Sequence, residues 1–203
     1  MTRMKSFLHV GCGPARKANT LPVFQGDDWQ EVRLDIDRAV SPDVVGSMTD
    51  MAAVASESMD AVYSSHNVEH LYPHEVGPAL TEFHRVLKPN GFAVVLCPDL
   101  QAVCKLVAEG KLLETVYVAP VGPIAPLDMI YGLRSSTQSG NHFMAHKCGF
   151  NRDLLFSCLH TAGFKSVAGT TRDGDLALCV VARKDGLPEP EMIAFTQTIL
   201  FPT

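Results

Sequence analysis

The sequence predicts an α/β fold whose mostly parallel sheet ends in an antiparallel hairpin. Short apolar, β-branched runs alternate along the chain with stretches of helical periodicity, which is the pattern of βαβ units. The run 92–97 is apolar on both faces, as expected of a central strand in a parallel sheet. Near the end of the chain, two strand-like runs are separated only by 171–175. This segment has Asp-Gly turn chemistry, so we expect a hairpin there.

The predicted strands are short and follow one another through the whole chain. The seven candidates are 6–10, 32–35, 44–45, 61–64, 92–97, 167–170 and 176–182. Helical periodicity occupies 75–87, 100–109 and 152–162. The last of these helices has Asn151 in position to cap its start and Gly163 just past its end, the residue types that favour such boundaries.

The length and composition are those of one globular domain. The chain has 203 residues, of which 46% are apolar and 19% charged, enough to bury a single large core. We expect one domain over residues 1–186 and a tail at 187–203, whose role the sequence leaves open. Residues 110–148 lack a regular period and are rich in proline, glycine and serine. A segment of this length is more often a functional lid than an idle loop.

Charge and cysteine content exclude some classes of protein. The formal net charge of -5 argues against a nucleic-acid backbone as the main partner, since such binding relies on an excess of lysine and arginine. The six cysteines are scattered without a C-x-x-C motif. The sequence has neither a signal-like apolar run nor a stretch of membrane-spanning length. We therefore expect reduced thiols and a cytoplasmic protein with no membrane span.

The first candidate site is a Gly-Cys-Gly turn at 11–13, directly after the first predicted strand. Glycine lets the backbone adopt positive φ and lets a ligand approach closely. Asp35 ends the second strand about twenty residues further on, where a carboxylate can accept hydrogen bonds from ribose hydroxyls, and Asp37 is the second choice. Arg16 stands where a dinucleotide-binding fingerprint has its third glycine, which argues against a nicotinamide cofactor.

Five segments of the chain carry a resemblance to a known family. They are H-V-G-C-G-P at 9–14, L-D-I-D at 34–37, S-M-D-A-V-Y-S-S-H-N-V-E-H-L at 58–71, F-H-R-V-L-K-P-N-G-F at 83–92 and L-C-P-D-L at 96–100. In this order and spacing they resemble the class I S-adenosylmethionine (SAM)-dependent methyltransferases, especially the type 11 group. The resemblance implies a three-layer, Rossmann-like methyltransferase fold with a seven-stranded sheet, and SAM (S-adenosyl-L-methionine) as the cofactor.

The resemblance also implies a set of cofactor-binding residues at the ends of the first four strands. They are Gly11, Cys12, Gly13, Asp35, Ile36, Ser47, Met48 and His66. The backbone of the glycine turn would face the amino-acid end of SAM, Asp35 would hold the ribose, and Ile36 would lie against the adenine. Ser47 stands where members of the family often have aspartate. The usual first helix is expected to be short or absent, because Pro22 and Gly26 interrupt it.

Histidines and one carboxylate are the candidates for the acceptor side of the reaction. We expect His66, Glu69 and His142 to act there, with His66 also beside the methionine part of SAM. His146 is a second histidine of the suspected lid. The H-x-x-E-H pattern at 66–70 matches a zinc-peptidase motif as well, but it follows a strand, and the Tyr-Pro pair after it leaves no long helix. No metal site is therefore expected.

The expected activity is transfer of the SAM methyl group to a small-molecule, sugar (glycan) or lipid-linked acceptor. Because the leaving group is a neutral thioether, positioning supplies much of the catalysis, and no catalytic dyad need be visible in the sequence. Two alternatives stay open. One is a SAM-fold binding or regulatory subunit without activity, and the other is an NAD-dependent oxidoreductase. The acceptor atom, a general base and the oligomeric state are not readable from the sequence.

Overall fold

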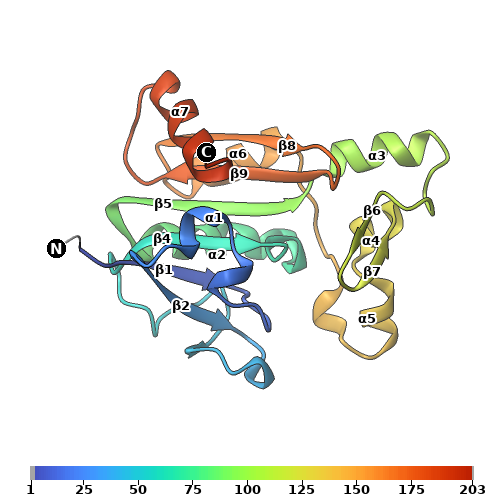
Figure 1. The fold of residues 1–203 in the computed structure, drawn as a ribbon, viewed down its shortest axis with the longest axis horizontal. Coiled ribbons are helices and arrows are strands. Elements are labelled where there is room, and N and C mark those ends of the chain that lie inside the picture. Colours follow the sequence, from blue (N-terminus) through green and yellow to red (C-terminus); the bar gives the residue numbers. More distant parts are fainter. Residues whose placement is uncertain (1–2, 203) are drawn as a thin grey trace.

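A seven-stranded sheet forms the centre of the protein (Figure 1). The computed structural model describes residues 3–202. The strand order is β3-β2-β1-β4-β5-β9-β8, and β9 runs antiparallel to both of its neighbours. The strands are β1 (Lys5–Val10), β2 (Trp29–Asp35), β3 (Val44–Val45), β4 (Met59–Ser65), β5 (Leu87–Pro98), β8 (Ser166–Arg172) and β9 (Ala177–Arg183). The predicted fold class, a mostly parallel sheet that ends in an antiparallel hairpin, is confirmed.

Helices cover both faces of the sheet, which gives three layers. They are α2 (Pro73–Val86) and α6 (Arg152–Thr161) on one face, and α1 (Pro22–Gln25) and α7 (Glu189–Leu200) on the other. Phe83 of α2 and Leu159 of α6 are fully buried in one core cluster. Phe24 of α1 and Met192 of α7 belong to a second cluster, on the opposite face of the sheet. Burial of each such side chain contributes about 1.5–3 kcal/mol to folding.

The connection between the first two strands contains little helix, as the sequence predicts. It holds one 3-10 turn, η1 (Lys17–Asn19), and the four-residue α1. Pro22 begins α1 and Gly26 follows its end, so the helix is stopped on both sides. Phe24 stacks on Phe7 with ring centroids 4.6 Å apart. This short element is therefore held by aromatic packing rather than by its own length.

Residues 110–148 fold into a small lobe beyond the carboxyl ends of the parallel strands, which we call the lid lobe (Figure 1). It contains β6 (Tyr117–Ala119), β7 (Gly122–Ile124), α4 (Pro126–Tyr131), α5 (Arg134–Gln138) and the 3-10 turn η4 (His142–Met144). The helix α3 (Leu100–Ala108) leads into it, and Val103 of that helix packs against Ile124 and Met129. Each element of the lobe is shorter than the window in which a period becomes visible, which is why the sequence shows none here.

The last helix, α7, packs on the sheet through Met192, Ile199 and Leu200. The sequence leaves open whether the segment 187–203 docks on the domain or on a partner, and in the structure its helix docks on the domain. Within residues 3–202, none of the helices combines the length and the apolar character needed to cross a membrane.

Candidate cofactor and acceptor site

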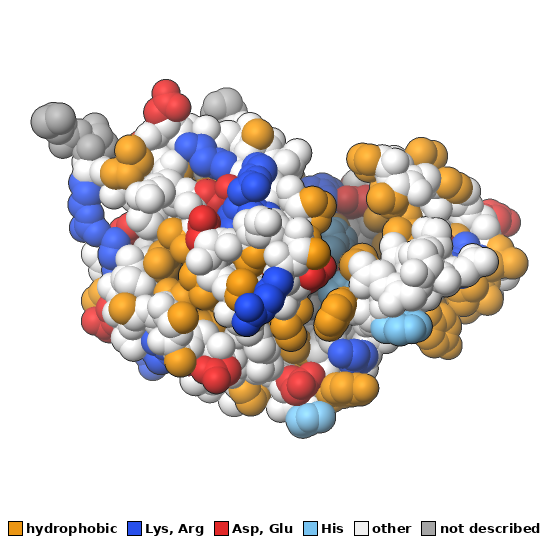
Figure 2. Space-filling model, turned by 90° about the horizontal axis from the view of Figure 1, so that it is seen from below, with side chains coloured by type: hydrophobic (Ala, Val, Ile, Leu, Met, Phe, Trp, Pro, Cys, Tyr) orange, Lys and Arg blue, Asp and Glu red, His pale blue; other side chains and the backbone are white. Residues whose placement is uncertain are grey.

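A cleft of about 340 Å³ lies at the ends of the parallel strands, between the sheet and the lid lobe. Figure 2 shows it as a hollow between two parts of the molecule, with histidine side chains (pale blue) on its floor. Its walls come from the turn after β1, the ends of β2 and β4, and the last part of the lid lobe. The strand order reverses here, since β2 and β4 lie on opposite sides of β1. Ligands of open α/β sheets bind at such a switch point.

Two glycines of the turn after β1 adopt positive φ, 63° at Gly11 and 50° at Gly13. A Cβ atom on Gly11 would lie 2.2 Å from the side chain of Asn67, so close packing requires this glycine as well as its backbone angle. A Cβ atom on Gly13 would meet no atom of the described residues within 4 Å, and Gly13 lines the cleft. A ligand can therefore approach the backbone closely at Gly13.

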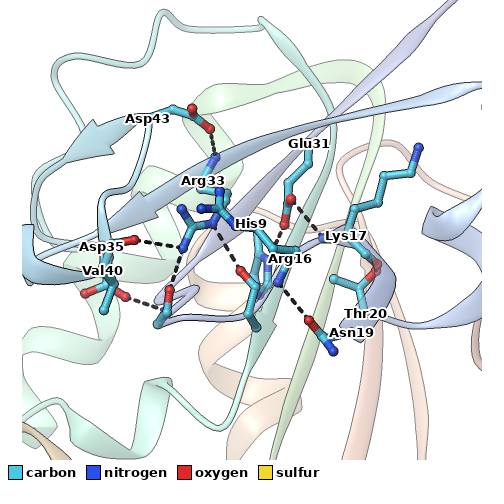
Figure 3. Close-up of polar contacts among 12 residues, drawn as sticks. His9, Arg16, Lys17, Asn19, Thr20, Glu31, Arg33, Asp35, Val40 and Asp43 are labelled. Carbon is cyan, nitrogen blue, oxygen red and sulfur yellow. Dashed lines mark hydrogen bonds and ion pairs between the residues drawn. The ribbon is translucent and has the colours of Figure 1, made fainter.

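Arg33 holds this turn from behind, with a side chain that is almost completely buried (Figure 3). Its guanidinium donates hydrogen bonds to the carbonyl of Gly13 at 2.6 Å, of Ala15 at 3.1 Å and of Ser41 at 2.7 Å. These bonds join the turn after β1 to the loop after β2. Arg33 is not among the predicted site residues, although an arginine between two apolar residues of a predicted strand is the signal that points to it.

Asp35 ends β2 and lines the cleft. Its Oδ2 accepts a hydrogen bond from the N–H of Gly13 at 2.7 Å, and its Oδ1 accepts one from the N–H of Asp37 at 2.8 Å. A carboxylate oxygen has two lone pairs, so each one retains a place for a ligand hydroxyl. Ile36 lies next to it in the cleft wall and is 55% exposed. The end of β2 thus offers a hydrogen-bond acceptor beside an apolar surface.

The remaining cofactor candidates divide between the cleft and the core. Ser47 and Met48 line the cleft, and the Oγ of Ser47 lies 2.7 Å from the Oγ1 of Thr49. The side chain of Cys12 is buried, and its N–H donates to the carbonyl of Leu34 at 3.3 Å. Burial raises the pKa of the Cys12 thiol to about 11. The structure thus brings Ser47 and Met48 to the cleft and leaves the Cys12 side chain in the core.

The acceptor-side candidates His66 and Glu69 lie together just after β4. His66 lines the cleft at a φ of 50°, and its Nδ1 lies 3.5 Å from Oε1 of Glu69. Glu69 belongs to the 3-10 turn η3 (Val68–His70) and is 1% exposed. Burial opposes the charge of this carboxylate, but three neighbouring imidazoles hold its pKa below the usual value. They are those of His66, His70 and His146.

His142, the third acceptor-side candidate, lies apart from this pair. It is exposed on η4, and the cleft wall is formed there by its neighbours, Phe143 among them. The lid lobe instead brings His146 to the buried carboxylate, with Nε2 4.0 Å from Oε1 of Glu69. Burial lowers the pKa of His146.

Comparison with known proteins relates part of the sequence to one family and the fold to solved structures. Residues 8–95 match a type 11 family model described as a methyltransferase domain. The sequence matches no curated protein. The resemblance to the class I SAM-dependent methyltransferases is confirmed, in sequence over 8–95 and in fold over 91% of the chain.

Solved structures share this fold at low sequence identity. A 1,6-didemethyltoxoflavin-N1-methyltransferase from Burkholderia thailandensis, with bound 1,6-didemethyltoxoflavin and S-adenosylhomocysteine, matches with a TM-score of 0.54 and 14% identity over 91% of this chain and 72% of that chain. A SAM-dependent methyltransferase from Methanosarcina mazei matches with a TM-score of 0.58 and 16% identity, over 91% of this chain and 94% of that chain. The PH0226 protein of Pyrococcus horikoshii matches with a TM-score of 0.62 and 15% identity, over 91% of this chain and 84% of that chain. This chain spans only 63% and 51% of two other matched structures.

Replacing Gly11 by alanine should destabilise the fold more than the same change at Gly13. Both changes place a side chain on backbone of positive φ, which costs roughly 1–2 kcal/mol, but only Gly11→Ala brings the new Cβ into Asn67. Thermal unfolding measures the difference. The double variant Gly11→Ala/Asn67→Ala removes the collision and should recover part of the stability. Equal destabilisation by the two single changes would contradict the packing argument.

Replacing Arg33 by leucine should lower the free energy of unfolding by about 4 kcal/mol or more, since four carbonyls, that of Val40 included, lose their donor at about 1–3 kcal/mol each. Arg33→Lys should recover only part of this loss, because an ammonium cannot reproduce the planar fork of donors. The matched control is Arg38→Leu, an exposed arginine after the same strand, which should change stability by less than about 0.5 kcal/mol. Urea unfolding provides the measurement, and similar losses at both arginines would refute the role of Arg33.

Proposed function

We propose that the protein binds SAM in the cleft and transfers its methyl group to a small-molecule, sugar or lipid-linked acceptor. The observation that carries this proposal is the clamp on Gly13. Its N–H donates to Asp35 and its carbonyl accepts from Arg33, so a glycine turn and an acidic residue are held side by side at the switch point. The match of residues 8–95 to a methyltransferase domain supports the proposal.

The residues of the cleft fit this cofactor. Asp35 offers carboxylate lone pairs to ribose hydroxyls, and Ile36 offers exposed apolar surface to the adenine ring. Gly13 leaves open space beside its Cα atom for the amino-acid end. The cleft volume of about 340 Å³ suits a small-molecule site. We assign to the cofactor Gly11, Gly13, Asp35, Ile36, Ser47, Met48 and His66.

The chain's own part in the reaction is to position the acceptor and to exclude water. When bound, SAM supplies an electrophilic methyl group on a sulfonium centre, whose departure as a neutral thioether requires little further chemistry from the protein. We assign residues 110–148 as the lid over the acceptor, because Phe143 and Met144 of this lobe line the cleft. The Burkholderia thailandensis enzyme, solved with 1,6-didemethyltoxoflavin and S-adenosylhomocysteine, supports a small-molecule acceptor.

On the acceptor side, we assign His66 to contact the acceptor and Glu69 to orient that imidazole. His66 lines the cleft, and Glu69 lies buried behind it at the distance of 3.5 Å given above. His142 is exposed outside the cleft wall, so we assign it no role in the reaction. The free thiols of all six cysteines support a cytoplasmic location.

One observation favours a second candidate, a SAM-binding subunit without activity of its own. The helix after the glycine turn is reduced to the four residues of α1, so less of the chain surrounds the cofactor. An enzyme transfers radiolabelled methyl groups from SAM to a member of an acceptor panel, whereas such a subunit binds SAM without turnover. An NAD-dependent oxidoreductase is distinguished by thermal stabilisation with NAD rather than with S-adenosylhomocysteine.

Calorimetric titration with S-adenosylhomocysteine tests the cofactor site. Asp35→Asn should weaken binding at least about tenfold, because a hydrogen bond to a charged group contributes about 1.5–3 kcal/mol. The matched control is Asp37→Asn, since Asp37 also lines the cleft but accepts a hydrogen bond from Ala39, and its affinity should change little. Thermal unfolding of both variants shows whether the loss of the carboxylate also weakens the hydrogen bonds that hold Gly13 and thereby destabilises the fold.

Two outcomes of this titration count against the proposal. No binding of S-adenosylhomocysteine to the wild-type protein at millimolar concentration overturns SAM binding altogether. Unchanged affinity in a folded Asp35→Asn variant rejects the contact of Asp35 with the ribose.

A further inference from the structure

We propose that Glu69, His70 and His146 form a binding site for one divalent transition-metal ion, zinc or a close relative, on the floor of the cleft. One ligand atom from each of these three side chains lies within 4.8 Å of the other two. The site brings η3 and the end of the lid lobe together, and it does not depend on the cofactor contacts described above.

The described residues do not fully compensate the negative charge of the Glu69 carboxylate. Glu69 is 1% exposed, and within residues 3–202 neither carboxylate oxygen has a hydrogen-bond donor. The nearest imidazole nitrogens belong to His66 at 3.5 Å and His146 at 4.0 Å from Oε1. A buried carboxylate without donors is costly, and buried charges in proteins are usually paired or bound to metal.

The two histidines of the site present lone pairs. The Nδ1 of His70 lies 3.1 Å from the carbonyl of Ala145, and the Nδ1 of His146 lies 2.9 Å from the carbonyl of Met129. A carbonyl can only accept, so each Nδ1 carries the proton, and Nε2 of the neutral ring is left as an acceptor. Metal-binding histidines are oriented in this way, with the other ring nitrogen bonded to a carbonyl.

When both rings are neutral, acceptor groups face one another across this cluster. Neutral imidazole nitrogens and a carboxylate have no hydrogen atom to share, and a metal ion satisfies all three at once. In a tetrahedral zinc site the ligand atoms lie roughly 3.3 Å apart, given zinc–ligand distances of about 2.0 Å. The cluster reaches this geometry by a contraction of up to about 1.5 Å, which rotation of the side chains can supply.

The ligand set indicates the class of metal. Two imidazoles and one carboxylate suit zinc, iron(II) or cobalt(II), whereas magnesium and calcium prefer sites made wholly of oxygen. Three protein ligands leave a fourth position open, as in catalytic zinc sites. His70, one of the three ligands, lines the cleft, so a bound ion would lie beside the space that we assign to the acceptor.

Cobalt(II) titration of the full chain, freed of metal with a chelator, tests the site. The exposed thiol is removed by Cys104→Ser. One equivalent of Co²⁺ should bind with a visible absorption band of low-coordinate cobalt, and Zn²⁺ should displace it. Glu69→Gln and His146→Gln should each weaken binding at least about tenfold, since even second-shell changes cost 10–100-fold. The matched control is His142→Gln, the exposed histidine of the same lobe, which should retain one equivalent.

Three results would each overturn the proposal. The first is the absence of saturable Co²⁺ or Zn²⁺ binding, and the second is binding that survives all of the ligand substitutions. The third is a thiolate-to-cobalt charge-transfer band, which identifies cysteine ligands. Zn²⁺ should also raise the melting temperature of the wild-type protein and not that of the folded variants. If Glu69→Gln fails to fold, His70→Gln and His146→Gln decide the outcome. Binding of S-adenosylhomocysteine to the chelator-treated protein is measured separately, so failure of the metal site is distinguishable from failure of the cofactor site.

Discussion

The part of the cleft that we assign to the cofactor depends on a row of charged side chains along β2. Glu31, Arg33 and Asp35 are spaced by two residues, so the pleat of the strand places them on one face (Figure 3). Glu31 accepts a hydrogen bond from the N–H of Lys17 at 2.9 Å. Arg33 donates to the carbonyl of Gly13, and Asp35 accepts from the N–H of the same residue. The row therefore fastens the whole segment after the glycine turn to the strand beside it.

This row explains how the chain dispenses with a long helix after the glycine turn. Pro14 and Pro22 interrupt the segment, so its backbone groups cannot all bond within a helix and need other partners. Side chains of β2 provide those partners. The guanidinium of Arg33 is buried among carbonyls of two loops, and its fixed fork of donors suits that position better than an ammonium. A charged strand residue thus replaces part of what helical hydrogen bonding supplies elsewhere.

The sheet and the glycine turn could be predicted because they are encoded locally. The apolar run 92–97 lies within β5, and the Asp-Gly pair of the predicted turn, at 173–174, lies between β8 and β9. The environments of Arg33 and Glu69 could not be predicted, because distant segments close over each of them and a charged residue ordinarily favours solvent. The H-x-x-E-H pattern predicts a metal site only on a helix, and η3 is a single 3-10 turn. The histidine that reaches Glu69 from the lid lobe, His146, lies too far along the chain for any such pattern.

The two halves of the cleft differ in how completely their polar groups are satisfied. In the part that we assign to the cofactor, the charge of Arg33 is met by carbonyls. In the part that we assign to the acceptor, the carboxylate of Glu69 lacks a donor within residues 3–202, yet the backbone carbonyl of Glu69 accepts hydrogen bonds from the N–H groups of Lys147 at 2.9 Å and Cys148 at 3.2 Å. That carbonyl ties η3 to the end of the lid lobe, so the segment that lines the cleft there also brings His146 to the carboxylate. The part of the cleft that we assign to the acceptor therefore takes its shape from the lid lobe, and a ligand that holds His146 against Glu69 also holds the end of this lobe.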